Sequence, residues 1–514
     1  MVTTSPVIVG RHEQAGDRQS GRERSRGRWA LALVCSATFM LVLDLTIVNV
    51  ALPSIQTSLH ASLTTLEWVI DAYALALAAL LLISGSLADR YGRRRVFRVG
   101  LGMFTFGSLA CSVASSSSVL VVSRAVQGIG GAALFATALA ILGQEFQGKS
   151  RGRALGVWGA AVALGLAVGP LAGGVLTDLI SWRAIFFVNV PLGTVAFVLA
   201  GTRLHESRDP DGTPLDWPGA LTFALTLLLL TFGFVEGNTR GWSSPPIVAS
   251  FVGACGFGIA FVWIEHARSG LVDLSLFRLR TFDAATLGVI GQGFVIGPLL
   301  FYLVRYLQEV LGASPLRAGL EIVPMTVTCF VAAILAGRAT SRVPIRLLLA
   351  ASLGLLGCGV LLMLFVREST SWTVVVPGLL IAGAGWGAVN PVAAEGALSS
   401  VPPERSGMAS GINGTGRQVG IAIGLGALGA VFQRRLQSVL TAEVARRHLL
   451  VPPGTVRLAA RGGLHSAAAA VPPTQRAGFV AASRVASTAA LHGVLLVGGI
   501  GAIAVGIAIA LLRD

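Results

Sequence analysis

Fourteen runs of apolar residues, each about 18–25 residues long, constrain the fold of this chain more than any other feature. A helix needs about 20 apolar residues to cross the ~30 Å hydrocarbon core of a bilayer, so fourteen such helices need about 280. Of the 514 residues, 54% are hydrophobic, which is almost that number. Only 12% are charged, about half the share in soluble proteins. These figures exclude an ordinary soluble enzyme and predict an all-α membrane protein.

The runs fall at about 29–50, 67–87, 96–115, 119–142, 154–177, 184–201, 217–236, 247–264, 283–304, 318–337, 344–366, 373–397, 409–432 and 488–511. We expect each run to be a helix, because backbone groups inside lipid must form their hydrogen bonds within the same segment. Residues 1–28 are polar and rich in arginine, and they lack the apolar core and cleavage site of a signal peptide. We expect them to form a disordered cytoplasmic tail.

The basic residues predict the orientation. The net charge is +15, and nearly all the basic residues are arginines at the ends of the apolar runs. With a cytoplasmic N-terminus, the short inner loops and the C-terminus carry about 18 Lys and Arg, against about five in the short outer loops. The positive-inside rule then places both termini in the cytoplasm. This pattern favours a topology signal over nucleic-acid binding.

One predicted outer loop, at about 433–487, departs from the rule because it carries eight arginines. Long segments cross a membrane largely regardless of their charge, so the predicted orientation holds. Pro and Gly residues separate two amphipathic stretches in this loop, and we expect two short helices on the outer surface. A solvated hairpin is favoured over a docking site.

Metal, disulfide and nucleotide sites are not expected. The five cysteines lie inside apolar runs without CxxC spacing, and the seven histidines show no ligand spacing. The segment GQEFQGKS at 143–150 fits the phosphate-loop pattern GxxxxGK[ST]. A true phosphate loop follows a strand in an α/β domain, whereas this segment follows an apolar run. We therefore expect no cofactor and no enzymatic activity.

The loop after the second apolar run has an ordered pattern, GSLADRYGRRRVF. Its central glycine permits a tight turn, and its aspartate can pair with an arginine or cap a helix N-terminus, where the helix dipole favours an anion. A plain basic loop would explain the arginines but not their order. The pattern is formed by Gly85, Asp89, Arg90, Gly92 and Arg93.

This loop resembles the signature of the major facilitator superfamily, Gly-x-Leu-Ala-Asp-Arg-x-Gly-Arg. Further segments resemble the fourteen-span drug:proton antiporter group of the EmrB/QacA type: LDLTIVNVALP, RAVQGIGGA, GLAVGPLAGG, SWRAIFFVNVPLG, YLQEVLGASPLRAGL and GINGTGRQVG. The resemblance covers about residues 29–432 and the last run. It implies a major facilitator fold, with six-helix bundles at 29–201 and 283–514 and two inserted helices within 202–282. The loop at Asp89 would hold the inner gate shut.

Three ionisable residues inside the predicted spans point to a functional cluster, because a charge in the membrane is costly and is a functional candidate by default. Asp44, Asp71 and Arg124 all lie about 8–10 Å below the outer surface, at 1.5 Å of rise per residue. Burial disfavours a charged carboxylate, whereas a nearby arginine favours it. A carboxylate balanced between these effects could load and release a proton. The alternative is a static salt bridge between helices.

The fifth run contains small residues at four-residue spacing, which lets a neighbouring helix approach closely. A proline within it removes one backbone hydrogen bond and kinks the helix. The family resemblance implies that this pattern accompanies exporters that exchange substrate for protons; ordinary packing is the alternative. The motif consists of Gly165, Gly169, Pro170, Gly173 and Gly174.

The expected substrate cavity lies between the bundles near the bilayer midplane. Arg417 falls near mid-membrane, where a charge should pair or face a cavity. For Trp386, a packing role is favoured over a place in the cavity. For Glu395, a position at the membrane interface is as expected as a place in the cavity. The candidate cavity residues are Asp44, Gln127, Trp386, Asn413, Arg417 and Glu395.

Together these features predict a proton-coupled exporter of drugs or antibiotics in a bacterial cytoplasmic membrane, expected to act as a monomer. Its partners would be a small-molecule substrate, protons and lipid, with no nucleic acid and no metal. Two alternatives remain: proton-coupled transport of a specific metabolite, and a non-transporting membrane receptor. The identity of the substrate is not encoded in any motif.

Overall fold

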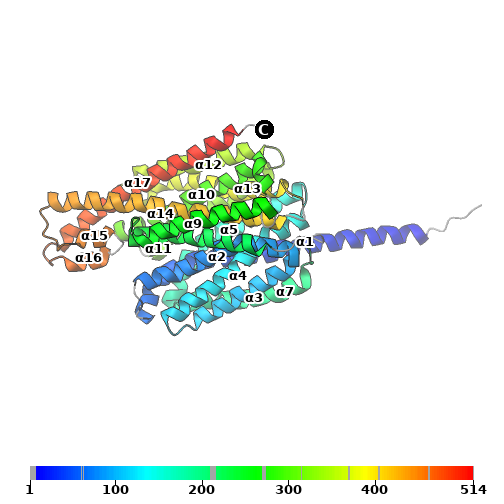
Figure 1. The fold of residues 1–514 in the computed structure, drawn as a ribbon, viewed down its shortest axis with the longest axis horizontal. Coiled ribbons are helices and arrows are strands. Elements are labelled where there is room, and N and C mark those ends of the chain that lie inside the picture. Colours follow the sequence, from blue (N-terminus) through cyan, green and yellow to red (C-terminus); the bar gives the residue numbers. More distant parts are fainter. Residues whose placement is uncertain are drawn as a thin grey trace, which may run out of the picture.

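This computed structural model describes residues 7–59, 61, 63–208, 216–268, 274–313, 315–368, 371–402, 406–460 and 464–512, and most of these residues are helical. These residues contain no strand. The helices form two bundles, with the first (blue to cyan) below the second (yellow to red) in Figure 1.

The first bundle contains α1 to α7. Their bounds are α1 (Val7–Leu59), α2 (Leu63–Tyr91), α3 (Arg93–Ser112), α4 (Ser117–Glu145), α5 (Lys149–Leu179), α6 (Ala184–Phe187) and α7 (Asn189–Arg203). Helix α4 packs against α2 and α3, and α1 packs against α5. Its interior is filled by apolar side chains that include Leu101, Phe104 and Leu139.

The second bundle contains α10 to α14 and α17. Their bounds are α10 (Arg280–Arg305), α11 (Pro315–Ala339), α12 (Ile345–Leu362), α13 (Val376–Ser399), α14 (Ser406–Arg446) and α17 (Arg476–Leu511). Short 3-10 turns lie at Leu274–Arg278, Met363–Phe365 and Trp372–Val375, and a π turn follows α10 at Tyr306–Val310. One continuous apolar core joins these helices.

Two further helices, α8 (Trp217–Arg240) and α9 (Pro245–Arg268), come between the two bundles in the sequence. They pack on each other. Helix α8 contacts α2 of the first bundle and α14 of the second. At the first contact the rings of Trp68 and Phe232 lie 6.2 Å apart. At the second, Gly426 of α14 lies against Phe234. The inserted pair therefore bridges the two bundles.

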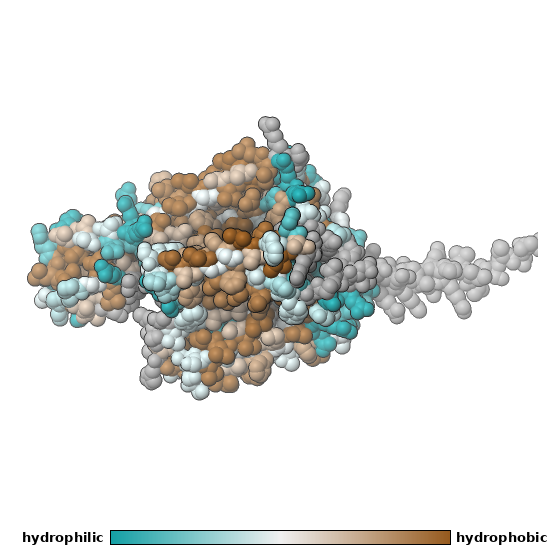
Figure 2. Space-filling model, viewed as in Figure 1, coloured by the Kyte–Doolittle hydropathy of each residue, from teal (hydrophilic) through white to brown (hydrophobic). Residues whose placement is uncertain are grey.

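Each of the fourteen predicted runs overlaps a helix. In the described part, eleven helical segments are long and apolar enough to cross a membrane, or twelve if α2, which bends by 51°, is one span. The chain is thus a multi-pass membrane protein, while the count of fourteen spans stays a prediction. Figure 2 shows an apolar brown band across the visible face, between teal polar ends.

The N-terminal segment differs from the predicted disordered tail. Helix α1 begins at Val7 and continues without a break into the first apolar run. The reason lies in composition, because residues 7–28 contain no proline and many arginine, glutamate and glutamine residues, which are good helix formers.

The predicted outer loop also differs from the expected pair of separate helices. Its first amphipathic stretch is the end of α14, and its second is the start of α17. With 41 and 36 residues, these helices are about 60 Å and 54 Å long, far more than the ~30 Å hydrocarbon core. Two short helices, α15 (Thr455–Ala460) and α16 (Leu464–Ala470), connect them at the left of Figure 1.

Candidate functional site

A fully buried ion pair between α1 and α4 lies at the centre of the first bundle. Asp44 is 0% exposed and Arg124 is 1% exposed. The Nη1 atom of Arg124 donates a hydrogen bond to Oδ2 of Asp44. The same nitrogen donates to Oε1 of Gln127 at 2.7 Å, and Nε donates to the Val69 carbonyl at 3.0 Å. The guanidinium is therefore held by three acceptors from three helices.

The second oxygen of the carboxylate is also held by the protein. Oδ1 of Asp44 accepts from Nε2 of Gln127 at 2.8 Å and from Nδ2 of Asn189 at 3.2 Å. Nε2 of Gln127 also donates to the Ser108 hydroxyl at 2.8 Å. A buried ion pair is tolerated only when further hydrogen bonds satisfy its remaining donors and lone pairs, and this network meets that condition.

Aromatic rings cover the arginine. The guanidinium carbon of Arg124 lies 4.3 Å from the centre of the Tyr73 ring and 5.8 Å from that of Phe186. Such cation–π contacts stabilise a desolvated guanidinium. The rings also surround the pair with apolar groups, so a change in the charge of Asp44 is felt by Arg124 with little screening.

The sequence positions this site through close helix packing. Arg124 and Gln127 lie one turn apart on the same face of α4. A Cβ atom on Gly128 would lie 2.5 Å from the Tyr73 carbonyl oxygen, and one on Gly107 would lie 2.9 Å from the backbone of Gln127. Glycine at these positions lets α2 and α3 approach α4 closely enough to place their polar groups against the ion pair.

Of the residues expected at this depth, the structure brings together Asp44, Arg124 and Gln127. The side chain of Asp71 lies outside the described residues. Five partners were missed: the Val69 carbonyl, the rings of Tyr73 and Phe186, and the side chains of Ser108 and Asn189. Only Asn189 had a detectable signal, because it is a polar amide inside the apolar segment SWRAIFFVNVPLG.

The junction between α2 and α3 reaches the second bundle, through Asp89 in the last turn of α2. Oδ1 of Asp89 accepts from Nη2 of Arg93 at 2.9 Å, and Oδ2 accepts from the backbone N–H of Met408 at 2.9 Å. Met408 lies in the first turn of α14, whose unpaired N–H groups and dipole favour an anion. Asp89 therefore joins the two bundles.

The motif that was expected to be a loop is helical on both sides of Gly92, which alone separates α2 from α3. Gly92 has a φ of 106°, a conformation that favours glycine, and a Cβ atom there would collide with Oε1 of Glu206. Glu206 also accepts from the backbone N–H of Arg94 at 3.1 Å. The guanidinium of Arg90 lies over the ring of Tyr91, and Gly85 lies within α2.

Other contacts join the bundles. Nε and Nη2 of Arg151 on α5 donate to both carboxylate oxygens of Glu395 on α13, at 2.9 and 2.7 Å. The Ser410 hydroxyl on α14 donates to the Ala136 carbonyl on α4 at 2.8 Å. The structure thus places Glu395, a candidate cavity residue, in a bidentate ion pair that crosses between the bundles.

The glycine motif of α5 lies against α1. A Cβ atom on Gly165 would lie 2.9 Å from the Phe39 carbonyl oxygen, and one on Gly169 would collide with the Thr46 hydroxyl. Gly173 and Gly174 are buried, and Gly174 has open space at its Cβ position. The side chain of Pro170 lies outside the described residues. The two glycines thus bring α5 against the helix that carries Asp44.

The candidate residues of the second bundle are divided between two places. Nη1 of Arg417 donates to Oδ1 of Asn390 at 3.5 Å, and its guanidinium carbon lies 4.2 Å from the centre of the Phe135 ring of the first bundle. Nδ2 of Asn413 donates to the Ala393 carbonyl at 3.4 Å. Arg417 therefore lies where α14 meets α4.

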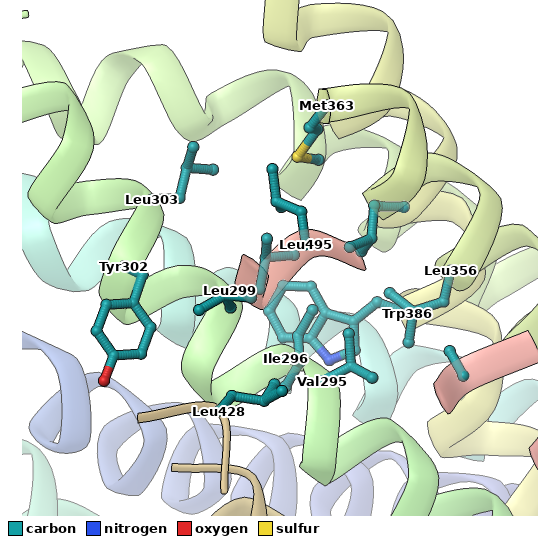
Figure 3. Close-up of a cluster of buried hydrophobic side chains, with 14 of the residues drawn as sticks. Val295, Ile296, Leu299, Tyr302, Leu303, Leu356, Met363, Trp386, Leu428 and Leu495 are labelled. Atoms are coloured by element: carbon teal, nitrogen blue, oxygen red, sulfur yellow. The ribbon is translucent and has the colours of Figure 1, made fainter. Parts of the chain in front are cut away.

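Trp386 occupies a different environment, inside the second bundle. Its side chain is 3% exposed and lies among apolar side chains that include Ile296, Leu299 and Leu495 (Figure 3). This is the packing role that the sequence favours for it. Beside it, Gln292 is fully buried, donates to the Trp386 carbonyl at 3.3 Å, and has no hydrogen-bond partner at Oε1 within the described residues. Sequence reasoning missed Gln292.

Two further patterns of the sequence can be located in the structure: the possible metal ligands and the GQEFQGKS segment. No three His, Cys, Asp or Glu side chains of the described ranges are grouped so that they could hold a metal ion. The GQEFQGKS segment connects α4 directly to α5, so the strand that precedes a phosphate loop is missing from this fully described stretch.

Comparisons with known proteins agree with this architecture. Residues 34–425 match the family model described as Major Facilitator Superfamily. The chain is 36% identical over 411 residues to "Multidrug resistance protein Stp" of Mycobacterium tuberculosis, covering 79% of this chain and 76% of that protein. It is 37% identical to "Cephamycin export protein CmcT" of Amycolatopsis lactamdurans, covering 80% and 87%.

Further similarity extends to an antibiotic resistance protein and a solved structure. The "Methylenomycin A resistance protein" of Streptomyces coelicolor is 34% identical, over 76% of this chain and 83% of that protein. The crystal structure of the human organic anion transporter MFSD10 superimposes with a TM-score of 0.60 at 15% identity, covering 93% of this chain and 99% of that one. The structural match concerns the fold alone.

Proposed function

Because the chain belongs to the major facilitator superfamily and is a membrane transporter, we propose that it exports drug-like or antibiotic small molecules in exchange for protons. The relatives above support the class of substrate, since their names refer to multidrug resistance, antibiotic resistance and antibiotic export. Its place would be the cytoplasmic membrane of a bacterium, with both termini inside.

The observation that carries proton coupling is the buried pair of Asp44 and Arg124. The carboxylate has no contact with solvent in this conformation, and its charge is balanced by one guanidinium. When the bundle opens to water, a proton can bind Asp44, and Arg124 then loses its counter-charge. A buried, uncompensated guanidinium is unfavourable, so protonation would favour a different packing of α1 against α4.

Alternating access then requires a gate that the charge state can influence. The contacts of Asp89 with α14 and of Arg151 with Glu395 hold the bundles together, and we assign this end to the cytoplasm. Helix α5 carries Arg151 and packs on α1 through Gly165 and Gly169. Movement of α1 on protonation of Asp44 would therefore reach α5 directly.

The proposed function can be tested in everted membrane vesicles from cells that produce the protein. We expect addition of an exported drug to dissipate a pre-formed proton gradient, because each export cycle carries protons in the opposite direction. A fluorescent pH probe measures this, with vesicles from cells lacking the gene as the control. Drug accumulation without any change in the gradient would contradict proton exchange, and proton movement with the drug in the same direction would indicate a symporter.

Replacing Glu395 with glutamine should weaken the gate. The ion pair with Arg151 is partly exposed, so we expect a loss of about 1 kcal/mol, which shifts the equilibrium between conformations about fivefold away from the present one. Spin-label distances across the α5–α13 contact measure this shift. The double charge reversal Arg151→Glu/Glu395→Arg is the matched control and should restore the wild-type distribution. If E395Q leaves the distances unchanged, the pair does not contribute to the gate.

A further inference from the structure

A groove of about 220 Å³ lies between the inserted pair and the protruding segment formed by α14, α15 and α17. Gly237, Gly241 and Trp242 of the α8–α9 turn form one wall. Helix α14 forms the second wall with residues 430–437, and α15 closes the end with residues 457–460. The groove lies apart from the contacts of Asp44 and from the gate, and the transport cycle proposed above does not use it.

The depth of the groove places it at a membrane surface. Ala430 lies 22 residues after Met408 on α14, which is about 33 Å of helix and matches the thickness of the hydrocarbon core. Gly237 likewise lies 20 residues after Trp217 on α8. The Trp242 ring stacks on Phe251 at an angle of 9°, in the position that tryptophan favours at the level of lipid headgroups.

The groove carries a concentrated positive charge. Arg434 projects from α14 and Arg457 from α15, and the amides of Gln433 and Gln437 lie beside them. Among the described residues that line the groove, none has a carboxylate. The nearby Arg240 is held by Glu236 at 2.6 Å, so that carboxylate is already engaged. Two guanidinium groups and two amides are suited to binding phosphate oxygens.

The turn leaves this charge open to a ligand. Gly241 has a φ of 91°, and a Cβ atom there would have nothing within 4 Å. A left-handed glycine thus closes the α8–α9 hairpin without placing a side chain over the groove. Ala430 and Ala460, which also line the groove, are small as well.

We propose that this groove binds the phosphate of an anionic phospholipid, with Arg434 and Arg457 holding the headgroup and the acyl chains continuing into the hydrocarbon layer beside α8. The depth favours a lipid over free phosphate, and the excess of positive charge favours an anionic lipid over a zwitterionic one. The lipid would bridge α8 and α14, and thus fix the inserted pair to the second bundle.

Native mass spectrometry of the purified full chain tests this by titration with dioleoyl phosphatidylglycerol or dioleoyl phosphatidylcholine. We expect the first phosphatidylglycerol to bind at least about tenfold more tightly than phosphatidylcholine. The variant Arg434→Gln/Arg457→Gln should weaken phosphatidylglycerol binding by between about 10-fold and 30-fold. The matched control, Arg435→Gln/Arg484→Gln, removes the same charge from the protruding segment outside the groove and should change binding less than twofold.

The remaining outcomes decide against the proposal. Equal losses in both double variants would show bulk attraction without a site, and equal binding of the two lipids would exclude recognition of the anionic headgroup. Stabilisation of the wild type by inorganic phosphate, without an effect of phosphatidylglycerol, would assign the groove to free phosphate. If the variants fold poorly, brominated phosphatidylglycerol should quench Trp242 fluorescence in the otherwise wild-type chain, and a Trp242→Phe variant should lose that quenched component.

Discussion

Replacing Asp44 with asparagine should abolish export against a gradient, with a fall of at least about 100-fold in proton-driven transport. Asparagine has nearly the same shape as aspartate, and its Oδ1 can keep the hydrogen bonds from Gln127 and Asn189. Its Nδ2 cannot accept the hydrogen bond that Arg124 donates to Oδ2 of aspartate. Asparagine cannot bind and release a proton as a carboxylate does, so the side chain at position 44 stays neutral throughout the cycle. The variant therefore removes the proton carrier and also leaves Arg124 without its counter-charge, as protonation of Asp44 would.

The measurement should separate coupling from a loss of fold. In proteoliposomes, the Asp44→Asn protein should still exchange labelled for unlabelled substrate down its gradient, while an imposed pH gradient should no longer drive accumulation. The matched control is Asp178→Asn, at an exposed position near the end of α5, which should behave like the wild type. Uphill transport retained by Asp44→Asn would remove this residue from the coupling mechanism.

The sequence was sufficient to predict the helices and the main charged pair. An apolar run of about 20 residues is a local property, so it predicts a helix without knowledge of the fold. The similar depths of Asp44 and Arg124 followed from counting residues from the ends of the runs. The structure then joins them through Oδ2 and Nη1. This contact fits both hypotheses, the proton site and the static salt bridge, so the geometry does not decide between them.

Other parts of the site were beyond the sequence for physical reasons. Serine and asparagine are common in membrane helices, where they often hydrogen-bond to a neighbouring helix. Ser108 therefore could not be singled out as a partner of Gln127, and the polar signal of Asn189 did not identify Asp44 as its partner. The pairing of Arg151 with Glu395 depends on how one bundle meets the other. That arrangement is not encoded within any one helix, and in the proposed transport cycle it changes.

The extensions of α14 and α17 beyond their apolar runs were not predicted, for a different reason. The apolar runs end at the membrane surface, but the helices continue beyond it. Leu436, Leu440 and Val444 of α14 are buried, and their spacing of four residues is a helical signal that the sequence does contain. Proline and glycine between the two stretches were correct signs of a break, although they separate extensions of two long helices.

Replacing Arg124 with methionine should destabilise the protein more than any other single change considered for it. Methionine keeps much of the volume but leaves Asp44 charged and buried without its guanidinium. Breaking a buried ion pair from one side costs about 3–5 kcal/mol, and the Val69 carbonyl and Gln127 Oε1 would also lose their donor. We expect a marked fall in unfolding temperature in detergent and no transport.

A double-mutant cycle identifies the charge as the cause. In Asp44→Asn/Arg124→Met, the uncompensated carboxylate is gone, so most of the lost stability should return while proton-driven export remains absent. The control Arg417→Met removes a half-buried guanidinium whose described partners are an amide and an aromatic ring, so it leaves no charged partner behind and should cost clearly less. If Arg124→Met were as stable as the wild type, the buried charge pair would contribute nothing to the stability of this conformation, and the role given to Arg124 as the counter-charge of Asp44 would be wrong.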